Sequence, residues 1–302
     1  MSHLFAISPQ VLWPYVTAAA FTLLASIALG RNYRSGRDRR LLRALGPMFI
    51  AIPMAVFGAD HLSDARDIMR IVPSWIPGPL FWTYFVGVCL IAAAVSIILR
   101  IQVRLSSILL SIMLLLFVVL MHIPNALAKP GDRFRWIVAA RDLSFSLGAL
   151  TLGIAEGRRS TFEERLLTAV QFALAAIAVF FGIEHLRHPQ CVPGVPLEKL
   201  MPAWIPLRQL WTSLTGVALI LGGIAMFIGR SRQIAAEALG GLVLAWVLVL
   251  YVPMMIMTPN IDCLNYVFDT LVYAGVFLVT ASAVAQPVQI SRDIGLPAST
   301  VH

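Results

Sequence analysis

The chain has 302 residues, of which 59% are hydrophobic and only 13% are charged, and its mean hydropathy is +0.84. A soluble domain of this size could not cover its surface with so few polar groups, so the composition excludes a soluble globular protein and indicates a membrane protein. The positive residues behind the net charge of +8 lie in short segments between apolar runs, which is typical of topology signals rather than of a nucleic-acid-binding face.

Nine apolar runs are long enough to cross a bilayer core of about 30 Å as helices, because backbone polar groups in lipid must be satisfied within their own segment. The sequence therefore predicts an all-α polytopic protein whose surroundings are the lipid bilayer. The first run is long enough to span and ends in an arginine cluster, so no cleavable signal is expected. The predicted spans are 11–29, 45–62, 80–99, 105–124, 135–155, 166–186, 210–229, 237–257 and 264–285.

Arginine residues are concentrated in the segment 30–44, between the first two predicted spans, and the loops on that side carry more positive charge than those on the other side. The positive-inside rule predicts that this side is cytoplasmic. The N-terminus is then outside and the C-terminus inside a cell membrane, which is the inner membrane if the protein is bacterial.

The chain contains an internal repeat. The hexapeptide FGADHL, Phe57–Leu62, reappears as FGIEHL, Phe181–Leu186, at an offset of 124, and VPSWIP, Val72–Pro77, reappears as MPAWIP, Met201–Pro206, at an offset of 129. The tripeptide HIP at the end of the fourth span matches YVP at the end of the eighth, also at an offset of 129. These matches indicate a duplicated unit whose second copy has a five-residue insertion in its first loop.

The repeat predicts how the chain is divided. An N-terminal transmembrane helix with a basic cytoplasmic loop occupies 1–44, the first four-helix repeat 45–159, the second four-helix repeat 160–286, and a cytoplasmic tail 287–302. Each repeat holds an even number of spans, so both copies have the same orientation and are related by an axis along the membrane normal. The predicted fold is two parallel four-helix bundles plus one N-terminal helix.

Ionisable side chains gather near the outer end of the first repeat. Such residues are costly inside a span and usually face the bundle interior, so we expect a pocket in which Asp142 pairs with Arg141 or His61. This cluster can relay a proton, bind a polar head group, or simply fix the packing of helices. A metal site is not predicted, because no two histidines share a helix face at close spacing. The candidates are Asp60, His61, His122, Arg141 and Asp142, and their counterparts in the second repeat are Glu184, His185, Tyr251 and Asp269.

Tryptophan and cysteine residues mark the same side of the membrane. Trp75 and Trp204 lie in the two PxWIP segments, which act either as rigid interfacial anchors or as lids over their bundles. Cys191 and Cys263 lie in outer loops of the second repeat, where an oxidising exterior permits a disulfide, and the alternative is two free thiols.

The FGxxHL helix end, the PxWIP turn, the following Trp and Gly, and the HIP tripeptide together resemble the DoxX family of membrane proteins. The likeness covers 45–155 well and 166–285 more loosely, so the chain looks like two such units fused behind an extra helix. Some members of that family are associated with quinone-linked sulfur oxidation or oxidative-stress complexes, and distant relatives act as cargo receptors. The positions that the resemblance carries across are His61, Trp75, His122, His185 and Trp204.

These observations predict a redox-associated membrane subunit that binds a quinone-like or other amphipathic ligand near the outer face of the first bundle. In this interpretation His61 and Asp142 handle protons, Arg141 holds a carbonyl or anionic group, and Trp75 covers the pocket. The chain carries no cofactor-binding motif, so it is at most one subunit of a quinone-linked oxidoreductase, with quinone as its only candidate cofactor and a redox protein as partner. The alternatives are a carrier for a small molecule and a scaffold or receptor for partner proteins.

Overall fold

The computed structural model describes residues 8–34 and 41–285, and the regular elements in these ranges are all helical. Nine helical spans in the described ranges are long and apolar enough to cross a membrane, one for each predicted span. The prediction of an all-α polytopic membrane protein is therefore confirmed. The predicted tail at 287–302 lies outside the described residues.

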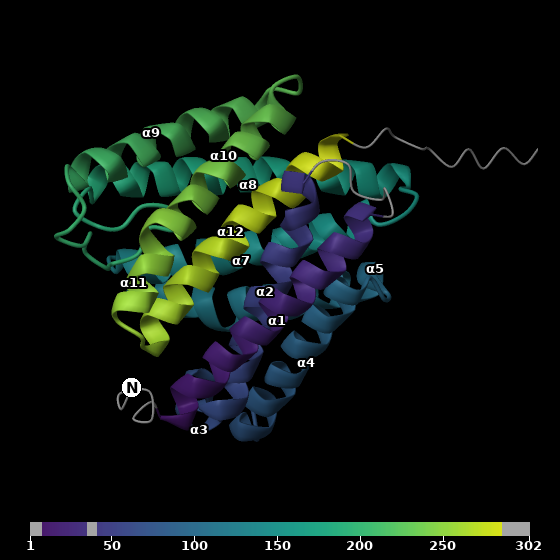
Figure 1. Cartoon of the computed structure of the whole chain (residues 1–302), viewed down its shortest axis with the longest axis vertical. Coiled ribbons are helices and arrows are strands. Elements are labelled where there is room, and N and C mark those ends of the chain that lie inside the picture. The colour runs from purple at the N-terminus through teal and green to yellow at the C-terminus, as the bar shows by residue number, and fades with distance from the viewer. Residues whose placement is uncertain (1–7, 35–40, 286–302) are drawn as a thin grey trace, which may run out of the picture.

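Helix α1 (Pro9–Arg34) precedes two halves of the chain, which we define as Leu41–Ala155 and Thr161–Ala285 (Figure 1). The first half comprises α2 (Leu41–Ser63), α3 (Ala65–Ile68), η2 (Met69–Ile71), α4 (Pro79–Leu99), α5 (Val103–Phe117), η3 (Val118–His122), α6 (Ile123–Ala128) and α7 (Arg133–Ala155). The second half comprises α8 (Thr161–Arg187), α9 (Arg208–Phe227), α10 (Arg232–Trp246), η4 (Val247–Tyr251), α11 (Val252–Met257) and α12 (Ile261–Ala285). The fourth and eighth spans each contain a π-helical segment near one end. Each of these two spans is therefore made of three consecutive elements, α5–η3–α6 and α10–η4–α11, respectively.

Glycine residues let the first two helices of each half approach closely. A Cβ atom on Gly58 of α2 would lie 2.7 Å from the carbonyl oxygen of Gly87 in α4. A Cβ atom on Gly182 of α8 would lie 2.6 Å from the carbonyl oxygen of Gly216 in α9. Neither contact tolerates a side chain, so the glycine of each FGxxHL segment sets the distance between two helices.

The π-helical segments η3 and η4 fall at matching positions of the two halves, 129 residues apart. Each is followed by a proline, Pro124 or Pro253, which lacks the N–H group that a regular helix would use there. A π segment widens the helix locally and turns the next side chains to new directions, and such segments are frequent at functional sites. His122 and Tyr251 are the last residues of these two segments.

The two halves share one core. Helix α12 packs against α2 and α7, and α7 also packs against α8, so the fourth helix of each half contacts the first helix of the other half. Helix α12 is the most enclosed of the described spans, with 89% of its 18-residue apolar stretch buried, whereas α1 has 11% and packs mainly on α2. The two halves are thus joined along an extended contact, which we call the seam.

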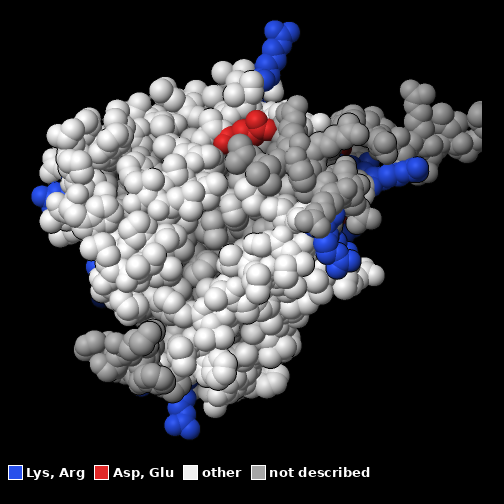
Figure 2. Space-filling view, in the orientation of Figure 1, with Lys and Arg blue, Asp and Glu red and all other residues white. Residues whose placement is uncertain are grey.

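The outer surface suits a hydrocarbon environment. Large apolar side chains on the outward faces of α4, α5 and α9 are exposed, among them Phe81, Leu109 and Leu221. Figure 2 shows that charged residues on this face of the molecule lie near its margins or in its upper part, while its broad middle is uncharged. Both PxWIP turns lie at one end of the helices, where α2 and α8 end and α4 and α9 begin, and we call it the PxWIP end.

Candidate functional site

Four ionisable side chains form a continuous chain of contacts at the seam, which we call the seam network. The Nε2 atom of His122 lies 2.7 Å from Oδ2 of Asp142. Arg141 donates from Nε to Oδ1 of Asp142 at 2.9 Å and from Nη1 to Oδ2 of Asp269 at 2.6 Å. His122 comes from η3, the next two residues from α7, and Asp269 from α12, so the network joins the two halves.

The seam network is largely buried, with side-chain exposures between 9% for Asp269 and 19% for Arg141. Charges in such surroundings require partners, and Arg141 supplies one cation to two carboxylates. Its guanidinium also lies 5.8 Å from the centre of the Phe145 ring. A protonated His122 makes the network neutral and a neutral His122 leaves it with one negative charge, so this imidazole controls the charge balance.

The partner of Asp142 is only partly as expected. Arg141 is one of the two predicted partners, but the imidazole in contact with the carboxylate belongs to His122 and not to His61. The Nδ1 atom of His61 donates instead to the carbonyl oxygen of Phe57 at 2.7 Å, one turn back along its own helix. Asp60 is half-buried and forms no ion pair with any residue in the ranges 8–34 and 41–285. The predicted cluster is therefore divided, with Asp60 and His61 separate from the seam network.

A second ion pair crosses the seam nearer to the PxWIP end. Arg133, the first residue of α7, donates from Nε to Oε2 of Glu184 in α8 at 3.0 Å. His188 and Glu198 lie farther off, with contacts of 3.9 Å to Glu184 and Arg133 respectively. Arg133 is not among the site residues that the sequence predicts. The position of Arg133 at the start of a predicted span indicates that its side chain can reach the end of a neighbouring antiparallel helix.

A loop segment fills the PxWIP end of the second half. Residues Cys191–Leu197, which we call the plug, are all buried although they have no helical structure. Cys191 pairs with Leu200 in an isolated β-bridge, which closes the loop on itself. Gly194 has a φ of +111°, a backbone conformation that favours glycine, and an added Cβ would lie 3.1 Å from Cγ2 of Thr270. The plug thus occupies space that a shorter loop would leave vacant.

The peptide bond between Pro193 and Gly194 is held from both sides. The hydroxyl of Tyr251 donates to the Pro193 carbonyl oxygen at 2.8 Å, and the Gly194 N–H donates to Nε2 of His185 at 2.9 Å. The Nδ1 atom of His185 donates to the carbonyl oxygen of Phe181 at 2.6 Å, so the ring is neutral with its proton on Nδ1. The predicted counterparts His185 and Tyr251 are therefore brought together by a peptide group of the protein itself.

Of the two alternatives for Cys191 and Cys263, a disulfide or two free thiols, the structure has the free thiols. Cys191 begins the plug, and its Sγ faces the carbonyl oxygen of Glu198 at 3.9 Å. Cys263 lies in the first turn of α12, where its N–H donates to Oδ1 of Asn260. The two thiols are buried in separate surroundings, and burial raises the pKa of the Cys191 thiol above its ordinary value.

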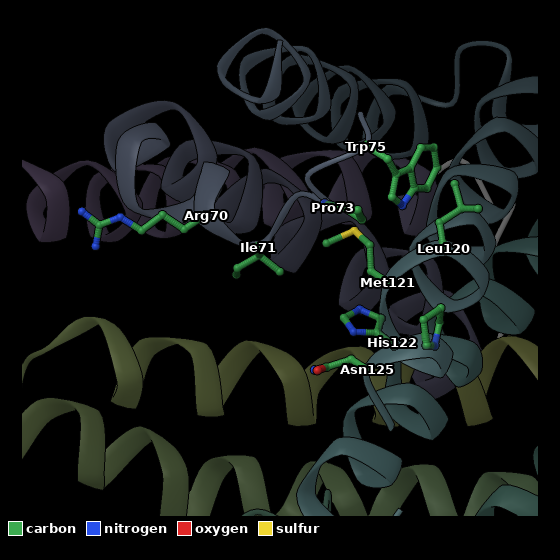
Figure 3. Close-up of a pocket in the computed structure, with 9 residues that line it drawn as sticks. Arg70, Ile71, Pro73, Trp75, Leu120, Met121, His122 and Asn125 are labelled. Atoms are coloured by element: carbon green, nitrogen blue, oxygen red, sulfur yellow. The ribbon is translucent and has the colours of Figure 1, made fainter. Parts of the chain in front are cut away.

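The PxWIP end of the first half has an open pocket of about 360 Å³. Its walls come from the loop before α4 and from the π-helical turn η3, and Figure 3 shows Trp75 above and His122 below Met121, with Arg70 extending away from them. Trp75 is 65% exposed, and Trp204, its second-half counterpart, is 44% exposed. The principal lining residues are Ile71, Pro73, Trp75, Leu120, Met121 and His122.

The pocket joins two of the predicted site residues directly and two indirectly. Trp75 and His122 line it, while Arg141 and Asp142 connect to it through the His122 ring. In the described part of the chain, no three His, Cys, Asp or Glu residues are grouped so as to hold a metal ion. The fold and site together define a multi-pass helical membrane protein with a one-sided pocket backed by a buried charged network. No protein-family model, curated protein or solved structure matches the chain.

Proposed function

We propose that the protein binds a small amphipathic ligand of the quinone type in the pocket of the first half and acts as a subunit of a membrane redox system. The observation that supports this most strongly is the position of His122. Its ring lines the pocket, while its Nε2 atom contacts Asp142 in the seam network. A polar head group in the pocket can therefore exchange a proton with a group that has a buried counter-charge.

The remaining walls suit the apolar body of such a ligand. Ile71, Pro73, Leu120 and Met121 supply aliphatic and thioether contacts, and Trp75 supplies an aromatic face. Pockets for small amphipathic molecules are generally apolar, with a few polar groups that fix the orientation of the ligand. The polar lining residues are His122, Asn125 and Arg70, and an imidazole beside apolar walls fits a ring that carries oxygen substituents.

The seam network supports a revised assignment of roles. His122 and Asp142 handle the proton, because the Nε2 atom of the ring contacts the carboxylate at 2.7 Å. Arg141 is engaged by Asp142 and Asp269, so it holds the two halves together instead of contacting the ligand. His61 is left outside this proton path.

The recurrence of glycine contacts and π-helical turns at matching positions supports a duplication and a relationship of each half to DoxX-like units. In the proposed topology the PxWIP end faces the extracytoplasmic side and the N-terminus lies outside, because the arginine-rich segment 30–44 is at the other end. A redox protein on that side would exchange electrons with the bound ligand.

The packing of the seam favours binding at one end over transport through the protein. Tyr273, Val276 and Phe277 of α12 are fully buried in the core that the halves share, where a carrier would need a passage. Inverted or broken helices meeting at the midplane, which many carriers use, are not part of the described arrangement.

The experiment compares two matched tryptophan variants. Trp75→Ala removes one wall of the pocket, and Trp204→Ala removes the exposed counterpart in the second half. Each protein is purified from membranes in mild detergent, extracted with solvent, and its retained quinone is measured per mole of protein by chromatography. We expect Trp75→Ala to lose most of the retained quinone and Trp204→Ala to keep the wild-type amount. Equal retention in both variants, or no quinone with the wild type, would contradict the proposal.

A further inference from the structure

The second half contains an internal occupant that shows what its histidine recognises. The Pro193–Gly194 peptide group presents a hydrogen-bond donor on one edge and an acceptor on the opposite edge, and it uses both. The donor N–H goes to Nε2 of His185, and the acceptor oxygen receives the hydroxyl proton of Tyr251. Thr212 adds a third contact by donating to the carbonyl oxygen of Cys191 at 2.7 Å.

The first half has counterparts of the two residues that hold the plug, but it has no counterpart of the plug itself. His61 aligns with His185 at an offset of 124, and His122 aligns with Tyr251 at an offset of 129. The Nδ1 atom of His61 donates to the carbonyl oxygen one turn back, as that of His185 does, so the proton is on the same nitrogen. In the neutral ring the Nε2 atom of His61 is then an acceptor, and it has no partner among the residues that the structure describes.

Loop length accounts for the difference between the halves. The loop between FGxxHL and PxWIP is five residues longer in the second half, and the plug lies in that loop. The shorter loop of the first half folds as α3 and η2, and the open pocket lies between this loop and η3. Thr83, the counterpart of Thr212, donates to the carbonyl oxygen of Pro79 in its own helix.

We propose that the first-half site includes His61 in addition to the residues that line the pocket, and that it recognises a head group with a hydrogen-bond donor on one edge and an acceptor on the opposite edge. The donor is directed to Nε2 of His61 and the acceptor to His122. For a quinone-type ligand this selects the reduced form, because a quinol has hydroxyl donors and the oxidised quinone has only acceptors. An imidazolium at His122 donates from Nε2 to Asp142 and from Nδ1 to the ligand, and it also makes the seam network neutral. This inference rests on the proposed function, since it specifies the redox state of the ligand at the same site.

The test measures the affinities of decylubiquinol and decylubiquinone for the full-length protein in nanodiscs, under anaerobic conditions, by quenching of tryptophan fluorescence. We expect the wild type to bind the quinol about tenfold more tightly, which corresponds to about 1.4 kcal/mol. His61→Asn keeps a donor for the Phe57 carbonyl oxygen but has no acceptor at the Nε2 position, so the preference should disappear. His61→Gln can place its amide oxygen at that position and should keep much of the preference.

His188→Asn is the matched control, because His188 is a partly exposed histidine at the end of α8 in the second half. It should bind both forms as the wild type does. Equal affinity of the wild type for the two forms, or an unchanged preference in His61→Asn, overturns the inference while the proposed function stands. Binding of neither form, or binding that Trp75→Ala leaves unchanged, overturns the proposed function itself. The wild-type comparison decides the matter even if a His61 variant does not fold.

Discussion

Replacing Arg141 with methionine is expected to destabilise the protein strongly. The side chain lies between two buried carboxylates, at 2.9 Å from Asp142 and 2.6 Å from Asp269. Asp142 keeps its contact with His122, whereas Asp269, whose side chain is 9% exposed, loses the cation that neutralises it. Removing one partner of a buried pair costs about 3–5 kcal/mol, because the remaining charge stays buried or must take up a proton. The fall should be visible as a lower midpoint of thermal unfolding in detergent, followed by circular dichroism.

Two further variants separate the charge effect from loss of packing. Arg141→Met combined with Asp269→Asn removes the stranded carboxylate and should recover a large part of the lost stability. Arg187→Met changes an exposed arginine at the end of α8 and should stay within about 0.5 kcal/mol of the wild type. An unfolding midpoint of Arg141→Met equal to that of the wild type would refute the seam network as a structural element.

Three other predictions concern the second half. Gly182→Ala should destabilise the protein by about 1–3 kcal/mol, because the new Cβ would lie 2.6 Å from a carbonyl oxygen of α9. Gly241→Ala is the control, since its Cβ would meet no atom within 4 Å, and it should be neutral or slightly stabilising in the same thermal assay. Intact mass spectrometry after alkylation of the denatured protein without reductant should find Cys191 and Cys263 both alkylated. An unmodified pair, with a mass 2 Da below that of the two thiols, would contradict this. In the native protein Cys191 should react faster as pH rises, because its raised pKa keeps the thiol protonated at neutral pH. Tyr251→Phe removes a buried hydrogen bond to the plug, so it should lower the free energy of unfolding by about 1–3 kcal/mol. It should also make the plug more susceptible to proteolysis. Unchanged cleavage would show that this hydrogen bond does not hold the plug in place.

The spans could be predicted from the sequence because each is a local property. An apolar run of about 20 residues is read without knowing its neighbours, and each of the nine predicted runs corresponds to a helical span in the described ranges. The polar candidates could be predicted for the same reason, because an ionisable side chain within such a run is conspicuous. The sequence predicts both His122 and Asp142 as site residues in this way, and the two are in contact in the structure.

The pairing of those residues could not be predicted, because it depends on which helices are neighbours and how each is rotated. The π-helical turn η3 brings His122 to Asp142, and nothing in the local sequence announces a π segment. The contact of α12 with α2 and α7 brings Asp269 to Arg141 across the seam. The plug was also missed, because a buried loop is an exception, and here it is explained by the hydrogen bonds that its backbone makes with side chains.

The central claim is that a ligand of quinone type occupies the first-half pocket beside His122 and Trp75. Its most direct test is photolabelling of the full-length protein in nanodiscs with an azidoquinone, followed by peptide mapping with and without excess decylubiquinol. We predict labelling that is competed by the quinol and confined to residues 69–76 and 118–125. Labelling spread over the lipid-facing helices, insensitive to competition, or centred on the second-half turn at 201–206 would contradict the account.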